Sequence, residues 1–255
     1  MVLEYDGTRY SGSQFQKTGP SVQEELETAV TKLTGERVRV AFAGRTDAGV
    51  HAWGQVAAFD TASSHRVETF VEGLTFWLPP DIAVVRASEA PPGFDPRRHA
   101  VSRTYVYLVL NRRSRSPLWA NRAWHVRDPV DLEPVRRLAA WLPGRRDWAA
   151  LAGKAGIRST VRTLTRCELR TKGPLLAFEV EAPSFLPHQV RRTVGALIEA
   201  GLGRRSVEAL VAEIERARPA SVGPVAPAHG LYLAQIAYRD IDLRPKAAVD
   251  EERKA

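Results

Sequence analysis

The chain has 255 residues, 44% of them hydrophobic and 26% charged, a composition that is typical of globular proteins and excludes disordered and fibrous classes. No apolar run approaches the roughly 18 residues that a membrane span needs. The single cysteine, Cys167, excludes a disulfide framework and a cysteine-based zinc site, so a cytoplasmic protein is expected. The net charge of +8, with 31 arginines among 37 basic residues, favours a polyanionic partner, although a GC-rich genome produces the same skew.

Two helices and four strands are predicted in the first hundred residues. Ser21 is a good N-cap, Glu24 completes a capping box with it, and Gly35 ends the first helix. Residues 37–43 alternate between apolar and polar side chains, as in a half-buried strand. In chain order the predicted elements are a strand at 2–5, a helix at 22–34, strands at 37–43 and 55–59, a helix at 67–78 and a strand at 82–87.

The second part of the chain begins after the proline-rich run 91–96, which is the strongest break in composition and places a domain boundary near residue 100. The predicted elements there are strands at 103–110 and 124–127, a helix at 132–142, a hairpin of 160–170 and 175–181, helices at 190–202 and 207–217, a strand at 231–239 and a charged, frayed tail after Asp240. The fold class is therefore α+β, with a mainly antiparallel sheet and helices on one face, in domains 1–100 and 101–255.

The glycine-flanked loop Gly44–Ala52 is the most informative stretch. It lies between two predicted strands, where functional groups commonly gather, and it matches neither a P-loop nor a dinucleotide fingerprint. From its surroundings, Asp47 fits a nucleophile, a general base, a metal ligand with His51, or a residue that caps the turn. A lone carboxylate next to arginine suits nucleophilic or ion-paired chemistry better than catalysis by two carboxyls.

Three other stretches carry candidate binding residues. Tyr5–Gln16 is rich in rings and amides, which suits either an ordinary loop with two buried rings or a surface that stacks on nucleic-acid bases. Tyr105 and Tyr107 share one strand face with Arg103, which is typical of a core and also of a stacking platform. Ser184–Gly195 enters a helix with Arg191 and Arg192 at the end that disfavours cations, so an anion (Asp47 or a phosphate) or a surface salt bridge is expected there.

Together these stretches resemble the tRNA pseudouridine synthase A family. The family pattern Tyr-Asp-Gly-Thr-x-Tyr-x-Gly-x-Gln-x-Gln stands at the start of the chain, and Gly-Arg-Thr-Asp-Ala-Gly-Val-His-Ala follows in the loop. The matching stretches keep the family's order: Tyr5–Gln16, Gly44–Ala52, Phe94–Arg97, Arg103–Tyr107, Phe185–Gly195 and Ala226–Leu233. One departure is Ser13, which stands where the family usually has tryptophan.

The resemblance implies a pseudouridine synthase fold, with two similar α/β halves around a central RNA-binding cleft. It further implies a homodimer that isomerises uridine at positions 38, 39 and 40 of the tRNA anticodon stem-loop, without cofactor or metal and without a membrane. Asp47 is then the catalytic residue in the first domain. Tyr105 stacks on the base, Arg191 pairs with Asp47, Arg45 contacts the RNA and Leu231 binds substrate; the second domain completes the site.

Two other functions fit parts of the same pattern. A non-catalytic RNA-binding or RNA-chaperone protein would use the same basic and aromatic residues, but an aspartate in a loop that meets a polyanion repels phosphate. A metal-dependent hydrolase would use Asp47 and His51 as ligands. The sequence also leaves open whether Asp47 attacks C1′ of the ribose, adds to the uracil ring or removes a sugar proton.

Overall fold

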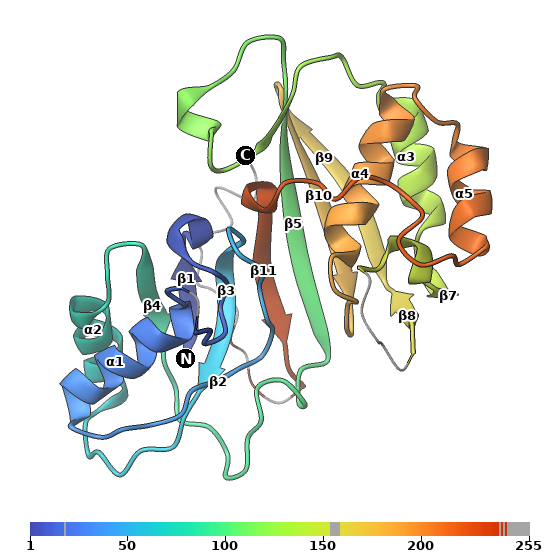
Figure 1. The fold of residues 1–255 in the computed structure, drawn as a ribbon. Helices are drawn as coiled ribbons and strands as arrows, with labels where there is room; N and C mark the ends of the chain where they lie inside the picture. Colours follow the sequence, from blue (N-terminus) through green and yellow to red (C-terminus); the bar gives the residue numbers. More distant parts are fainter. Residues whose placement is uncertain (18, 154–158, 240, 242, 244–255) are drawn as a thin grey trace. The chain divides into compact units, whose positions relative to one another are not determined.

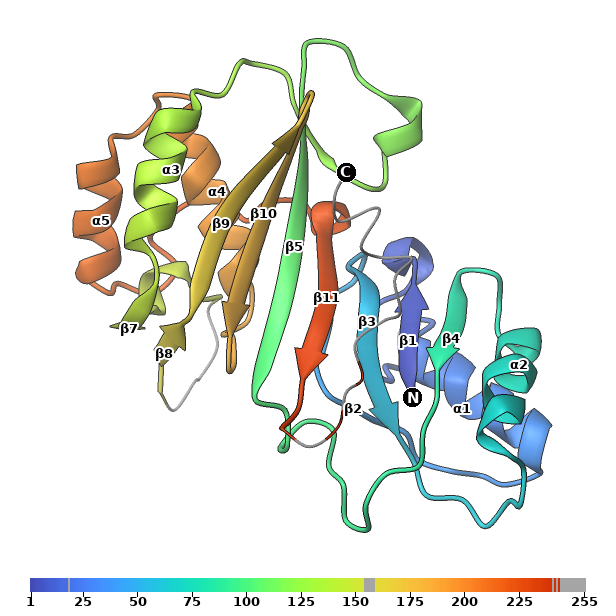
Figure 2. The same ribbon diagram turned by 180° about the vertical axis from the view of Figure 1, so that it is seen from behind.

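A computed structural model describes residues 1–17, 19–153, 159–239, 241 and 243 (Figures 1 and 2). It divides into two compact units, Met1–Arg103 together with the chain from Tyr232 on, and Thr104–Leu231. Both units combine helices with a mostly antiparallel sheet, so the predicted α+β class is confirmed. The predicted charged tail after Asp240 lies almost entirely outside the described residues.

The first unit is a sheet covered by two helices. Its strands run in the order β4-β1-β3-β11, and β2 pairs with the end of β3. β1 is antiparallel to both of its neighbours, whereas β11 is parallel to β3. The elements are β1 (Val2–Tyr5), α1 (Val22–Thr34), β2 (Ala41–Phe42), β3 (His51–Ala58), α2 (Val67–Trp77), β4 (Ile82–Arg86) and β11 (Leu231–Ala237). Helices α1 and α2 lie side by side and bury their apolar stripes, which consist of Val22, Leu26, Ala29, Val30, Phe70 and Leu74 (Figure 1).

Local sequence rules account for the ends of α1. The Ser21 side chain accepts a hydrogen bond from the Glu24 N–H at 3.3 Å, and Gly35 ends the helix with a φ of 76°. The strand predicted at 37–43 is wrong in extent, because only Ala41–Phe42 pair as a strand. The reason is tertiary: Glu27 of α1 accepts from the Val40 N–H at 3.0 Å, and Gln23 donates to the Val40 carbonyl at 3.0 Å. These side chains use the backbone groups that a sheet neighbour would otherwise have bonded.

The second unit has a sheet with β10 between β5 and β9, and β6 runs parallel to β5. In both views α4 lies across one face of β9 and β10, next to α3 (Figures 1 and 2). The elements are β5 (Ser102–Asn111), β6 (Trp124–Val126), α3 (Leu132–Trp141), β7 (Gly144–Asp147), β8 (Val161–Leu164), β9 (Arg166–Lys172), β10 (Leu175–Ala182), α4 (Gln189–Gly201) and α5 (Val207–Glu215). Short 3-10 turns span Gly7–Arg9, Pro117–Trp119, Ala149–Leu151 and Ala228–Gly230.

Two strands in the second part of the chain differ from the prediction. The strand expected at 160–170 breaks at Thr165, so that β8 pairs with β7, which was not predicted, and only β9 pairs with β10. Thr165 itself donates its N–H to the Glu181 carbonyl at 2.8 Å. The last strand also differs in its assignment: β11 pairs with β3 of the first unit, whereas the division at residue 100 placed it in the second domain. None of the described helices is long and apolar enough to cross a membrane.

Candidate active site

The loop that carries Asp47 is bound along its length to the loop that follows β1. Ser13 donates its N–H to the Thr46 carbonyl at 3.1 Å, and its side chain accepts the Thr46 N–H at 2.9 Å. Asp47 forms an isolated β-bridge with Gly12. The Gly49 N–H donates to the Tyr10 carbonyl at 3.3 Å, and Gly49 makes the turn with a φ of 76°. The motifs at 5–16 and 44–52, which lie apart in the sequence, therefore form one structural unit.

Side chains alternate along this loop between the interior and the solvent. Thr46 is 7% exposed, whereas its neighbours Arg45 and Asp47 are both exposed. Among the described residues, the Arg45 guanidinium has no hydrogen bond or ion pair. The backbone of the loop is thus fixed from below, and it presents a carboxylate and a guanidinium to a substrate.

A buried polar network lies beneath the loop. The Tyr5 hydroxyl and the Thr46 hydroxyl are 2.9 Å apart, and Gln55 donates to Tyr5 at 3.4 Å. Gln55 also bonds both backbone groups of Gly44, donating to the carbonyl at 2.8 Å and accepting from the N–H at 3.3 Å. Burial raises the pKa of Tyr5 to about 12, so the phenol stays protonated at neutral pH. Ser13 and Gln55 are completely buried, and the side chains of both are hydrogen-bonded, as buried polar groups require.

Sequence reasoning missed Gln55, which it treated only as part of a returning strand. The signal was present, because Gln55 is an amide within the otherwise apolar run Gly54–Ala58. Ser13 is the residue that departs from the family pattern. Its buried hydroxyl serves the Thr46 backbone directly, so at this position a small polar side chain performs a defined structural role.

His51, the first residue of β3, is a structural residue next to this loop. Its ring is 2% exposed, its Nδ1 atom accepts the Gly7 N–H at 3.0 Å, and the Asp6 carboxylate lies 3.2 Å from the same nitrogen. The ring stacks on Tyr232 with a centroid distance of 4.7 Å, and Tyr232 stacks in turn on Trp53 at 4.3 Å. Within the described ranges there is no group of three or more His, Cys, Asp or Glu side chains that could hold a metal ion.

Arg103, the residue at the end of the first unit, also supports the loop. One terminal nitrogen of its guanidinium donates to the Ala43 carbonyl at 3.1 Å and to the Arg97 carbonyl at 2.7 Å. Ala43 immediately precedes the loop, so Arg103 and Gln55 fix the same end of it. The motif around Phe94–Arg97 is thereby linked to the loop through one guanidinium.

In the second unit, the two tyrosines of β5 have different surroundings. Tyr107 is fully buried, and its hydroxyl donates to the Pro227 carbonyl at 2.7 Å, so it is a core residue. Tyr105 is 9% exposed and meets the Phe185 ring edge-on, with a centroid distance of 5.3 Å. This contact joins the motif at 103–107 to the motif at 184–195, as the sequence alone did not predict.

The arginines at the start of α4 are held by backbone carbonyls. Arg191 donates from Nε to the Ala226 carbonyl at 2.7 Å, and one Arg192 nitrogen lies within 3.0 to 3.4 Å of three carbonyls in residues 220–223. Partial negative charges of these carbonyls thus offset part of the Arg192 charge, and the prediction of a compensating anion at this helix end stays a prediction. Leu231, at the start of β11, is 6% exposed. The predicted ion pair between Asp47 and Arg191 stays a prediction.

Comparisons with known proteins give the following relatives. The family model described as tRNA pseudouridine synthase matches residues 1–97 and 138–239, a range that includes Arg45, Asp47, Arg191 and Leu231 and omits Tyr105. A tRNA pseudouridine synthase A of Myxococcus xanthus is 46% identical over 94% of this chain and 91% of its own length. Proteins of the same name from Geobacter sulfurreducens and Pelobacter propionicus are 42% and 40% identical over 93% of this chain and 98% of their own.

Proposed function

The chain belongs to the tRNA pseudouridine synthase family, and on that basis we propose that it isomerises uridine to pseudouridine in tRNA with Asp47 as its catalytic carboxylate. The enzyme is an isomerase. We assign its targets to positions 38, 39 and 40 of the anticodon stem-loop, as the family resemblance implies. A homodimer in the cytoplasm is part of the same proposal, because a folded tRNA is wide compared with one subunit of 28.2 kDa and the one cysteine is a buried free thiol.

The reaction needs few chemical groups. The bond between ribose C1′ and uracil N1 breaks, the base turns within the site, and a bond forms between C1′ and C5. The C5 proton is released and N1 takes up a proton. The product has the same atoms as the substrate, so no electrons are exchanged with a partner. The leaving uracil is also the group that returns, so no second carboxyl has to activate water, in contrast to glycoside hydrolysis. One ionised carboxylate that forms or stabilises the intermediate therefore suffices.

The observation that carries the proposal is the fixed backbone beneath an exposed Asp47. Ser13 bonds both backbone groups of Thr46, Tyr5 bonds its side chain, and Gln55 bonds the Gly44 backbone, so these contacts limit the movement of the loop. A carboxylate on such a support reaches a sugar or a base in a defined geometry, which is the main requirement for covalent catalysis. A purely RNA-binding protein has no use for an acid held in this manner.

The other substrate contacts are assigned by their chemistry. A uridine must leave its stack to be reached, which costs a few kcal/mol, and stacking on an aromatic ring offsets about 1–3 kcal/mol. We assign this stacking to Tyr105. We assign the pairing with Asp47 to Arg191, the contact with the RNA at the site to Arg45, and a further substrate contact to Leu231.

The test measures tritium released to water from tRNA labelled at uracil C5. Wild-type protein is expected to release tritium, and Asp47→Asn to lower the rate by a factor of about 1,000 or more while tRNA binding is retained. Asp60→Asn is the matched control, because Asp60 is an exposed acid of the same unit outside the loop, and its rate is expected to equal that of the wild type. Undiminished release by Asp47→Asn would overturn the catalytic assignment. Binding without any release by the wild type would instead support the RNA-chaperone function.

A further inference from the structure

The segment from Asn111 to Val130 concentrates positive charge. It contains five arginines and one acidic residue, so its net charge is +4, whereas the whole chain of 255 residues has +8. The arginines are Arg112, Arg113, Arg115, Arg122 and Arg127, and the acid is Asp128. Most of this segment lies outside a regular element, between β5 and α3, and none of it belongs to the residues that the family model matches.

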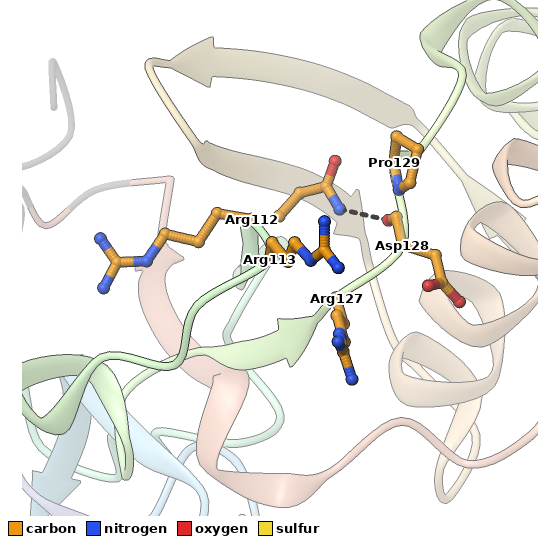
Figure 3. Close-up of a pocket in the computed structure, with 6 residues that line it drawn as sticks. Arg112, Arg113, Arg127, Asp128 and Pro129 are labelled. Carbon is orange, nitrogen blue, oxygen red and sulfur yellow. Dashed lines mark hydrogen bonds between the residues drawn. The ribbon is translucent and has the colours of Figure 1, made fainter.

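Part of the segment closes around a cavity of about 480 Å³, here called the arginine pocket. The residues that line it are Asn111, Arg112, Arg113, Arg127, Asp128 and Pro129 (Figure 3). Arg112 extends away from the other two arginines in this view, whereas Arg113 and Arg127 lie on the same side as Asp128. Three arginines and one aspartate thus line the pocket, and the Arg113 and Arg127 side chains lie nearest to each other (Figure 3).

Asn111 fixes the walls of the pocket. It ends β5 opposite Val126 of β6, and its side chain donates to the Val126 carbonyl at 3.0 Å and to the Asp128 carbonyl at 2.7 Å. The side-chain oxygen of Asn111 also accepts the Val130 N–H at 3.1 Å. These three bonds hold residues 126–130, and with them the backbone of Arg127, against the end of β5.

The arginines of the pocket differ in what they bond. Arg112 uses its guanidinium internally, donating to the Ser114 carbonyl at 2.9 Å and to the Arg115 carbonyl at 3.0 Å, which orders the loop. Within the described part of the chain, the guanidinium groups of Arg113 and Arg127 have neither a hydrogen bond nor an ion pair. Both side chains are exposed, and each offers five N–H donors.

We propose that the arginine pocket binds backbone phosphates of the RNA substrate through Arg113 and Arg127. The positive charges of arginines that line one cavity repel each other in the free protein, and the negative charge of a bound phosphodiester would offset this repulsion. A guanidinium group can also bind two oxygens of one phosphate. The pocket offers no aromatic ring for stacking and no enclosed apolar wall for a base, so the contact positions the RNA without reading its sequence. This inference rests on the proposed function, since the RNA is the tRNA that the enzyme modifies.

The experiment measures tRNA binding by the full chain over a range of salt concentrations. The double variant Arg113→Gln/Arg127→Gln is expected to raise Kd about tenfold or more at low salt and to reduce the slope of log K against log salt by about 2, one for each phosphate contact. The control double variant Arg136→Gln/Arg145→Gln removes the same charge from exposed positions of the same unit and leaves the slope unchanged.

Asp128→Asn gives an effect of opposite sign. Its backbone carbonyl still accepts from Asn111, while the negative charge next to the phosphate is lost, so Kd is expected to fall a few-fold. A further variant, Arg113→Lys/Arg127→Lys, keeps the charge and is expected to restore most of the salt slope. This recovery separates loss of a phosphate contact from loss of the fold.

Three results would overturn the proposal. One is an unchanged Kd and salt slope in the Gln double variant, and another is an equal change in the control double variant. The third is that inorganic phosphate stabilises the wild-type protein against unfolding, while the affinity for tRNA is the same with and without Arg113 and Arg127. Failure of the proposed function is distinct, because it would show as absence of tritium release by wild-type protein that still binds tRNA.

Discussion

The loop that carries Asp47 and the arginine pocket are both polar segments that follow strands, yet they are built in opposite ways. In the Asp47 loop the residue next to the acid, Thr46, is buried and bonded through its backbone and its side chain. In the arginine pocket the backbone is fixed by Asn111, while the functional side chains Arg113 and Arg127 are exposed and have no partner among the described residues.

This difference follows from the chemistry proposed for each region. Bond making at one carbon requires a carboxylate placed within a fraction of an ångström, and only a buried, fully bonded support gives that precision. A phosphate contact depends mainly on charge and tolerates side-chain movement. Substitutions beneath the Asp47 loop are therefore expected to change kcat, whereas those at the arginine pocket change affinity.

The largest effect is expected from Gly7→Ala. A Cβ atom at Gly7 would lie 2.0 Å from the Val50 carbonyl oxygen, which is backbone and cannot rotate away. The 7–13 segment must separate from the Asp47 loop, so we expect a loss of roughly 2–4 kcal/mol in unfolding free energy and about a hundredfold in single-turnover rate. Urea denaturation and tritium release measure these quantities.

Gly173→Ala is the control for that substitution. Gly173 has a φ of 55° with open space around it, so alanine there costs about 1 kcal/mol and leaves the rate unchanged. A Gly7→Ala enzyme that turns over like the wild type would show that the packing of these two loops does not set the position of Asp47.

A smaller effect is expected from Tyr5→Phe. The substitution removes the hydroxyl that bonds Thr46 and Gln55 and leaves their buried groups short of one partner, which costs about 1–3 kcal/mol of stability. We expect kcat to fall about tenfold with little change in KM. The reason is that the substitution loosens the Thr46 backbone next to Asp47 and leaves the proposed RNA-binding side chains in place. Steady-state kinetics on tRNA checks both parameters.

Tyr238→Phe is the matched variant for Tyr5→Phe. The Tyr238 hydroxyl donates to the Pro96 carbonyl at 2.7 Å, so the same atom is removed from the same unit without breaking a hydrogen bond to Thr46 or Gln55. It is expected to lower stability by a similar amount and to keep kcat within about twofold of the wild type. Equal losses of kcat in both variants would mean that the network beneath Asp47 has no special role.

The smallest effect is a pH dependence of stability. Burial raises the pKa of Tyr5 to about 12, while tyrosine in the unfolded chain ionises near pH 10. Between these values the folded state retains a proton that the unfolded state loses, so the free energy of unfolding falls as pH rises, by up to about 1.4 kcal/mol per pH unit. Urea denaturation at pH 9, 10 and 11 gives the slope of the unfolding free energy against pH. In Tyr5→Phe this slope is expected to be smaller by up to the contribution of one proton, about 1.4 kcal/mol per pH unit. An identical slope in both proteins would contradict the assignment of this shift to Tyr5.

Much of the fold follows from local sequence patterns. The caps at Ser21 and Gly35, the helical spacing of α1 and α2 and the glycine turn at residue 173 depend on neighbours within a few residues, and the structure confirms them. The strand at 37–43 was overextended because Gln23 and Glu27, more than ten residues away, bond the Val40 backbone. Pattern rules carry no information about such distant partners.

The sequence by itself determined the family, the α+β class, and the motifs that contain Asp47, Tyr105 and Arg191. Only the tertiary structure decided that Ser13 and Tyr5 bond Thr46 while Gln55 bonds Gly44, that carbonyls hold Arg192, and that Arg113 and Arg127 line one cavity. The physical reason is that the residue type fixes which chemical groups a side chain has, whereas its burial and its hydrogen-bond partners depend on segments that come together only when the chain folds.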